Sequence, residues 1–218
     1  MVELNSLIIN SDFIGLESAL ISYPELANQN IPFDDNIRTV AHPLHRISDA
    51  VFSKKITDKQ AAELAALFIK YGSKVDGYPI QPCKDSPLIA ACSLLADKVA
   101  LLLIEKGANI HHPGTHGGTA LHWAAFCGRP LILSKLVESG ADVNKYCFDF
   151  KSTPLIWAVQ GSIQNTSGST LVHQKCIQIL ITNGADKNSL NAAGETAFQL
   201  IKKHKLDHLA EILYSNTF

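Results

Sequence analysis

The chain has 218 residues, of which 46% are hydrophobic and 18% are charged, and its formal net charge at pH 7 is −1. This composition argues against an intrinsically disordered chain, and the near-neutral charge argues against a nucleic-acid ligand, whose binding proteins usually carry a basic surface. No stretch approaches the roughly 20 apolar residues of a membrane span, and no secretory signal pattern opens the sequence. The five cysteines are odd in number and form no C-x-x-C pair, so we expect a reduced, cytoplasmic protein with no membrane partner.

Two helices are predicted before residue 24. Residues 11–21 form an amphipathic segment that begins with a capping side chain, and Pro24 ends it. Residues 4–10 form a shorter helix before it. We expect this pair to be a degenerate first repeat that covers the hydrophobic core of the repeats that follow.

From residue 42 onward, two short phrases alternate along the chain. The first phrase is typified by Thr153-Pro-Leu-Ile-Trp-Ala158, and its copies begin at His42, Ser86, Thr119, Thr153 and Thr196. The second phrase is typified by Gly140-Ala-Asp-Val-Asn144, and its copies begin at Gly72, Gly107, Gly140 and Gly184. The first-phrase starts are 44, 33, 34 and 43 residues apart, which indicates a 33-residue repeat with about ten extra residues in two copies.

Each repeat is predicted to contain two helices. Ser or Thr followed by Pro begins the first helix, because the hydroxyl caps the helix and Pro needs no N–H in the first turn. In the second helix, four apolar positions lie on one face before the glycine that ends it. These positions are 64, 65, 68 and 69; 99, 100, 103 and 104; 132, 133, 136 and 137; and 176, 177, 180 and 181.

The extra residues of the two longer repeats lie between the two helices. The first insertion covers residues 48–59. The second includes residues 161–169, whose Gly, Ser, Asn and Thr content predicts a polar, flexible loop. A last helix pair is predicted at residues 195–204 and 206–214 and is expected to cover the other end of the core.

These phrases resemble the ankyrin repeat, whose pattern is Thr-Pro-Leu-His-x-Ala near the start and Gly-Ala-Asp-Val-Asn near the end. Residues 119–144 match closely, apart from Ala120 in the Pro position, while other copies depart at His42, Ile89, Ile156, His111 and Asp76. The resemblance implies an all-α ankyrin-repeat α-solenoid with short β-hairpin or loop connections. It implies one domain over residues 1–218, with an N-cap at 1–38, repeats at 39–82, 83–115, 116–149 and 150–192, and a C-cap at 193–218.

The resemblance also implies that partners contact the connecting loops and the first helices. Tyr146, Phe148 and Phe150 alternate in one loop, where exposed aromatic side chains favour a contact surface. Trp123 and Trp157 share one position in successive repeats and either pack in the stacked core or line the binding groove. The candidate partner-binding residues are Tyr78, Ile80, Gln81, Lys84, His112, Thr115, His116, Lys145, Tyr146, Phe148, Phe150, Lys151, Trp123 and Trp157.

Patterns for catalysis or metal binding are weak. His111, His112, His116 and His122 fall within twelve residues, but their spacing matches no zinc motif. The resemblance instead implies that His122 and His45 bond backbone groups between repeats. Cys127 follows His122 by five residues, but it ends a repeat helix, and together with Cys92 and Cys176 it is expected to be a buried small hydrophobe. We expect no catalytic residue, no metal and no cofactor.

The sequence therefore predicts a non-enzymatic, monomeric module that binds a protein through its hairpin loops and concave helical face. More specific alternatives are an immunity protein that neutralises a bacterial toxin, since residues 117–125 look like ankyrin proteins of toxin–immunity loci, and a secreted effector that binds host proteins. Asn144 and Asn188 match the position that oxygenases hydroxylate in animal ankyrin proteins, so the chain as a modification substrate is a further alternative. A cryptic enzyme or a metal-binding protein is the remaining one.

Overall fold

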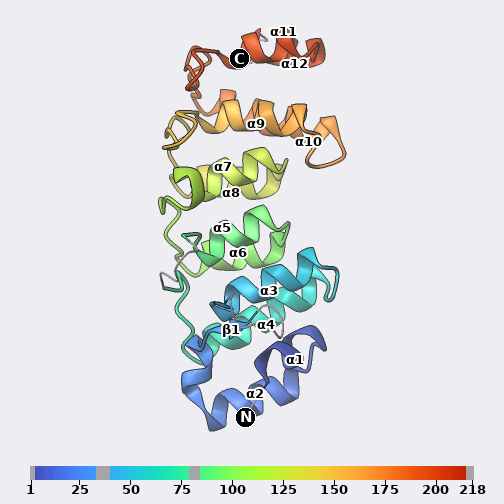
Figure 1. The fold of residues 1–218 in the computed structure, drawn as a ribbon, viewed down its shortest axis with the longest axis vertical. Coiled ribbons are helices and arrows are strands. Elements are labelled where there is room, and N and C mark those ends of the chain that lie inside the picture. Colours follow the sequence, from blue (N-terminus) through green and yellow to red (C-terminus); the bar gives the residue numbers. More distant parts are fainter. Residues whose placement is uncertain (1–2, 33–39, 79–83, 215–218) are drawn as a thin grey trace. The chain divides into compact units, whose positions relative to one another are not determined.

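A computed structural model describes residues 3–32, 40–78 and 84–214. The described residues are mostly helical (Figure 1). They fall into two compact units, one up to Asn109 and the other from Ile110 onward. The all-α fold class expected from the sequence is confirmed. The division of the chain into repeats at the residue boundaries given above stays a prediction.

The first unit consists of successive helix pairs. Its elements are α1 (Leu4–Ile9), α2 (Phe13–Ser22), the 3-10 helix η1 (Pro24–Asn28), β1 (Ile31–Pro32), β2 (Val40–Ala41), α3 (Pro43–Phe52), α4 (Asp58–Lys70), α5 (Pro87–Ser93) and α6 (Asp97–Glu105). The two short strands pair antiparallel, with Ile31 opposite Ala41. Helix α3 packs against α4 and α5, and α4 packs against α6, so each pair stacks on the next.

The second unit repeats the same arrangement. Its elements are the 3-10 helix η2 (Thr115–Gly117), α7 (Ala120–Phe126), α8 (Pro130–Glu138), α9 (Pro154–Ile163), α10 (Thr170–Thr182), α11 (Ala197–Lys203) and α12 (Asp207–Tyr214). Helix α9 packs against α7, α10 and α11, while α10 also packs against α8 and α12. The predicted helix pairs at both ends of the chain are therefore confirmed by α1–α2 and α11–α12.

The predicted faces of the second helices are buried in the core of each unit. Within each set of four apolar positions the first three are buried in all four repeats, and only the fourth is half-buried in some of them. The glycine after each set has a positive φ, between 81° and 93°, which an L side chain adopts only with strain. The predicted helical register is confirmed.

Both insertions lengthen helices. Helices α3 and α9 have 10 residues and α4 and α10 have 13, whereas α5 and α7 have 7 and α6 and α8 have 9. The predicted placement of residues 48–59 between two helices is wrong at both ends, because α3 continues through Phe52 and α4 begins at Asp58. The predicted loop over residues 161–169 is wrong for its first three residues, because α9 continues through Ile163. A helical interior tolerates Gly161 here because the residue packs directly against neighbouring backbone, a tertiary contact that outweighs its low helix propensity.

Asparagine side chains bridge successive repeats. The Asn144 carboxamide donates to the Gly184 carbonyl oxygen (2.9 Å) and accepts from the Asp186 N–H (2.8 Å). Asn28 makes the same pair of bonds with Gly72 (2.9 Å) and Lys74 (2.8 Å) in the first unit. Both the amide nitrogen and the amide oxygen of Asn144 thus have structural partners. Asn28 makes matching bonds, so the segment around η1 is joined to the next helix pair in the same way as a repeat is joined to its neighbour.

Candidate functional site

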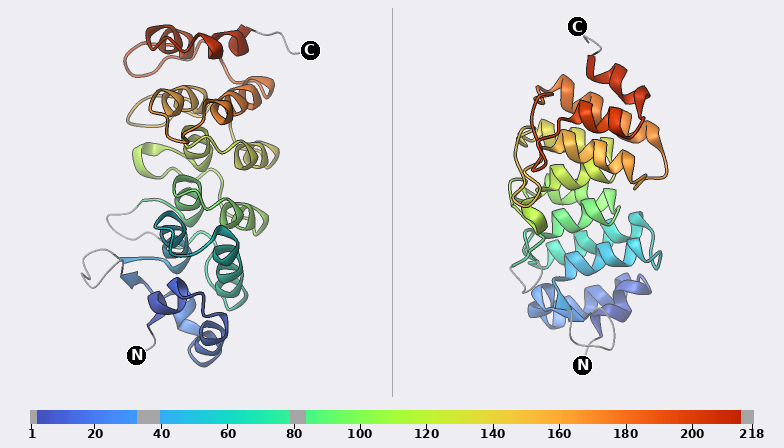
Figure 2. Two further views of the ribbon diagram at one scale, coloured as in Figure 1. Left: turned by 90° about the vertical axis from the view of Figure 1, so that its right-hand side faces the viewer. Right: turned by 45° about the horizontal axis from the view of Figure 1, so that its top comes forward.

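Backbone hydrogen bonds join the three connecting loops of the second unit, residues 112–118, 145–152 and 189–195. The carbonyl oxygen of His116 accepts from the N–H groups of Phe148 (2.9 Å) and Asp149 (3.2 Å), and that of Phe150 accepts from Ala192 (2.8 Å). The loops lie together beside the helices of this unit (Figure 2). A surface that spans several loops is therefore held in one arrangement.

His116 holds the first of these loops against the second. Its backbone has φ 59°, its Nδ1 lies 2.9 Å from Asp149 Oδ2, and its ring centroid lies 4.8 Å from that of Phe150. Gly117 follows with φ 71°, and a Cβ there would lie 2.5 Å from the Phe148 ring. The close approach of the two loops therefore requires glycine at position 117.

His122 holds the loop at residues 145–152 in place through hydrogen bonds. The Thr119 N–H donates to His122 Nδ1 (3.1 Å), so the other ring nitrogen, Nε2, carries the proton and donates to the carbonyl oxygens of Lys145 (3.0 Å) and Ser152 (3.3 Å). The predicted backbone-bonding role of His122 is confirmed. Burial lowers the pKa of His122 to about 4, because the charged imidazole would lose its hydration.

We expect acid to destabilise the second unit through His122. The pKa of His122 is about 4 in the folded protein and near the ordinary 6.5 in the unfolded chain. The contribution of His122 to the free energy of unfolding is therefore complete above pH 6.5 and is lost as the pH falls toward 4. A shift of this size corresponds to about 3 kcal/mol. Urea unfolding at pH 7 and pH 4.5 should show that His122→Asn is less stable at pH 7 but loses less free energy of unfolding than the wild type between the two values. Equal losses would contradict this role.

Four aromatic side chains form a cluster in the same unit as His122. The Trp157 ring centroid lies 5.2 Å from that of Trp123, 5.9 Å from that of Phe126 and 6.1 Å from that of Phe150. The Trp123–Trp157 and Phe126–Trp157 pairs are edge-to-face, with interplanar angles of 79° and 75°. The Trp157 indole N–H donates to Cys147 Sγ (3.4 Å), which fixes the ring. Such contacts make a rigid apolar surface.

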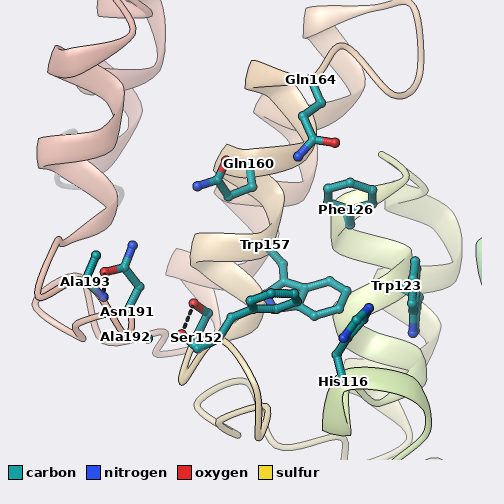
Figure 3. Close-up of a pocket in the computed structure, with 11 residues that line it drawn as sticks. His116, Trp123, Phe126, Ser152, Trp157, Gln160, Gln164, Asn191, Ala192 and Ala193 are labelled. Atoms are coloured by element: carbon teal, nitrogen blue, oxygen red, sulfur yellow. Dashed lines mark hydrogen bonds between the residues drawn. The ribbon is translucent and has the colours of Figure 1, made fainter.

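The cluster forms one wall of an aromatic groove with a volume of about 460 Å³. Figure 3 shows the side chains that line the groove, which come from α7, α9 and the connecting loops: His116, Trp123, Phe126, Phe150, Ser152, Trp157, Gln160, Gln164, Asn191, Ala192 and Ala193. None of these eleven residues is Asp, Glu, Lys or Arg. The groove therefore suits an uncharged ligand surface.

Four of the predicted partner-binding residues meet in this groove: His116, Trp123, Phe150 and Trp157. Trp157 is only 6% exposed, whereas Trp123 and Phe126 are half-buried. The two open interpretations of the tryptophans thus both hold in part, since Trp157 is packed in the core and still lines the groove. Sequence reasoning did not single out Phe126, Ser152, Gln160, Gln164 and the loop at 191–193. The i, i+3 and i+7 spacing of Trp157, Gln160 and Gln164 is the signal that places them on one helical face.

The aromatic side chains of the loop that contributes Phe150 to the groove are exposed. The exposed fraction is 45% for Tyr146, 65% for Phe148 and 47% for Phe150. Lys145 and Lys151 are also exposed in this loop, and His112 and Thr115 are half-buried in the preceding one; none of these four lines the groove. Exposed aromatic side chains next to a preformed apolar groove are typical of a contact surface.

The remaining predicted site residues belong to the first unit. Tyr78 is half-buried, and its hydroxyl donates to the Asn28 carbonyl oxygen and lies 2.6 Å from Asn30 Oδ1, so it holds its loop to η1. Lys84 is exposed. Ile80 and Gln81 lie outside the described residues.

The described thiols are buried. Cys127 and Cys176 are buried as expected, and burial raises the pKa of Cys127 to about 11 and that of Cys176 to about 12, which opposes thiolate formation. Within the part of the chain that the structure describes, no three His, Cys, Asp or Glu side chains are grouped as metal ligands would be. The helices in that part are also too short or too polar to cross a membrane.

Comparison with known proteins gives one family. The family model for ankyrin repeats in three copies matches residues 56–147 and 116–191. Human palmitoyltransferase ZDHHC13 is 28% identical over 98 residues, which are 45% of this chain and 14% of that protein. Palmitoyltransferase Hip14 of Drosophila melanogaster is 30% identical over 92 residues, 42% of this chain and 13% of that protein. The Bos taurus inactive serine/threonine-protein kinase TEX14 is 30% identical over 109 residues, 50% of this chain and 7% of that protein. The chain thus spans only a small part of each of these relatives.

Proposed function

Because the chain belongs to the ankyrin repeat family, whose repeats form protein–protein interaction modules, we propose that its second unit binds a protein through the aromatic groove and the loop beside it. The observation that carries this proposal is the exposure of Tyr146, Phe148 and Phe150 in one loop, whose Phe150 lines the groove. Burial of these rings by a partner would remove apolar surface from water at about 25 cal/mol per Å². Aromatic anchors in such places carry most of the binding energy in many interfaces.

The rigidity of the surface supports the same proposal. The loops are joined through the carbonyl oxygens of His116 and Phe150, and His122 anchors the middle loop. A partner therefore meets rings whose positions are already fixed, which lowers the entropic cost of binding. The transferase activity in the names of the palmitoyltransferase relatives belongs to those proteins, and we propose none for this chain.

A partner titration tests the proposal. The partner is recovered by affinity capture on the whole chain, identified by mass spectrometry and titrated calorimetrically against Tyr146→Ala/Phe148→Ala. We expect the dissociation constant to rise at least about 30-fold, since two interface aromatics typically contribute 1 kcal/mol or more each. The matched control is Leu131→Ala/Leu171→Ala, because these side chains are 63% and 55% exposed on α8 and α10 and line no part of the groove. An unchanged dissociation constant in the folded aromatic variant would reject this location.

A further inference from the structure

The insertion in the fourth repeat lengthens the groove. Trp157 occupies the repeat position that Trp123 occupies one repeat earlier, so Gln160 corresponds to Phe126 and Gln164 corresponds to Pro130. In the shorter repeat α7 ends at Phe126 and α8 begins at Pro130, whereas α9 continues through Ile163. Trp157 and Gln164 are separated along α9 by about 10 Å, which is the length of about three residues of extended chain. Without the extension of α9, the groove would end near Gln160.

Gln160 and Gln164 have hydrogen-bonding groups available for a ligand. Gln160 lies on α9 and Gln164 is the residue directly after it, and both line the groove (Figure 3). Neither side chain bonds to another residue of the described chain. Asn191 differs, because its Oδ1 already accepts from the N–H groups of Ala193 (2.9 Å) and Glu195 (2.9 Å). The two glutamines therefore present two donor–acceptor pairs at the groove that no internal contact uses.

The helical spacing of Gln160 and Gln164 is close to the two-residue repeat of an extended peptide. Side chains at i and i+4 of a helix have Cβ atoms about 6 Å apart. In an extended chain, main-chain groups that point the same way recur every two residues, or about 6.6 Å. Each glutamine can donate to a peptide carbonyl oxygen and accept from a peptide N–H, so the pair can hold alternate residues of one strand.

The aromatic wall selects the side chains of such a peptide. The ring centroids of Trp123 and Trp157 are 5.2 Å apart, so the rings pack on each other and leave no space between them for a cation. No lining residue carries a carboxylate, ammonium or guanidinium group. A charged side chain in the groove would lose hydration without a partner, whereas a bulky apolar side chain gains contact with the rings.

Polar contacts hold the loop after α9 and helix α10 against the end of α7, and α9 itself packs closely against the same place. The Thr166 hydroxyl donates to the Phe126 carbonyl oxygen (2.6 Å), and His173 Nε2 lies 3.0 Å from the same oxygen. Gly161 lies so close to this carbonyl that a Cβ would be 2.0 Å from its oxygen. The backbone that bears Gln160 and Gln164 is therefore held in place before a ligand arrives.

We propose that the aromatic groove takes an extended, uncharged peptide segment of three or four residues, whose main chain bonds Gln160 and Gln164 and whose bulky apolar side chain packs on Trp123, Phe126 and Trp157. This rests on the proposed function and names the chemistry of the partner. It also gives the insertion a role, since the lengthening of α9 places the carboxamides of Gln160 and Gln164 where they can bond the peptide main chain.

A phage-displayed library of random dodecapeptides, selected on the immobilised whole chain, tests the proposal. We expect the enriched sequences to share a short uncharged core with a bulky apolar residue. The best synthetic peptide should lose at least about tenfold in affinity, or roughly one hydrogen-bonded pair, when Gln160→Leu/Gln164→Leu replaces the wild type. Methylation of a core amide nitrogen should cause a similar loss. The control is Gln174→Leu on α10, which lies outside the groove.

Several outcomes overturn the proposal. They are an absence of enrichment over the uncoated surface, a charged residue at the conserved core position, and equal affinity of the peptide for the wild type and the folded double glutamine variant. Rejection of the peptide proposal can be told apart from rejection of the proposed function. If Tyr146→Ala/Phe148→Ala weakens partner binding while the glutamine variant leaves peptide binding unchanged, only the peptide-backbone contact is rejected.

Discussion

Gly161→Ala should destabilise the protein by about 3 kcal/mol, at the upper end of the usual cost of overpacking. The new Cβ would lie 2.0 Å from the Phe126 carbonyl oxygen and 2.7 Å from His173 Nε2. Neither neighbour can move freely, since the carbonyl belongs to the end of α7 and the imidazole bonds to it at 3.0 Å. Helix α9 would therefore have to shift away from α7. Urea unfolding monitored by circular dichroism measures the change.

Ser162→Ala is the matched control for this substitution. Ser162 is the next residue of α9, and its buried hydroxyl has no hydrogen-bond partner among the described residues. Removal of this hydroxyl should leave stability within about 1 kcal/mol of the wild type, or raise it slightly. If Gly161→Ala proved as stable as Ser162→Ala, the close contact between α9 and the end of α7 would be wrong.

Leu103→Ala should lower the free energy of unfolding by about 2–5 kcal/mol. Leu103 is fully buried on α6, at one of the face positions that the repeat register predicts. A cavity there removes contacts to the stacked helix pairs of the first unit, and a repeat stack depends on each interface between neighbours. Chemical denaturation gives the size of the effect.

The adjacent Leu102 controls for the loss of leucine itself. It lies on the same helix but is only half-buried, so Leu102→Ala should cost clearly less than Leu103→Ala. Equal costs for the two variants, or an unchanged midpoint for Leu103→Ala, would contradict the register of α6.

The fold was accessible from the sequence because local signals repeat. The buried helix faces, the glycines of positive φ and the capped helix starts each follow from side-chain spacing and backbone sterics, and four copies of each remove the ambiguity of one. The extent of α9 was not accessible, because residues 161–163 carry loop-like composition. Their helical state depends on the packing of Gly161 against Phe126, which no local pattern reports.

The candidate site was predictable only in part for a similar reason. Trp123, Trp157, His116 and Phe150 stand out by residue type and by their place in the repeat, and the structure places all four at the groove. Gln160 and Gln164 are unremarkable polar residues until the length of α9 is known. Asn191 to Ala193 enter the site through the bond between Ala192 and Phe150, a contact over more than forty residues of chain.

Site-specific cross-linking tests the central claim, that a protein partner contacts the aromatic loop beside the groove, most directly. A photoreactive benzoylphenylalanine replaces either Phe148 or Leu131, two side chains that are 65% and 63% exposed in the same unit. Each whole-chain variant is irradiated with the captured partner, and the adducts are mapped by mass spectrometry. We predict efficient cross-linking from position 148 and little from position 131. Equal yields, or cross-links from position 131 alone, would contradict the account.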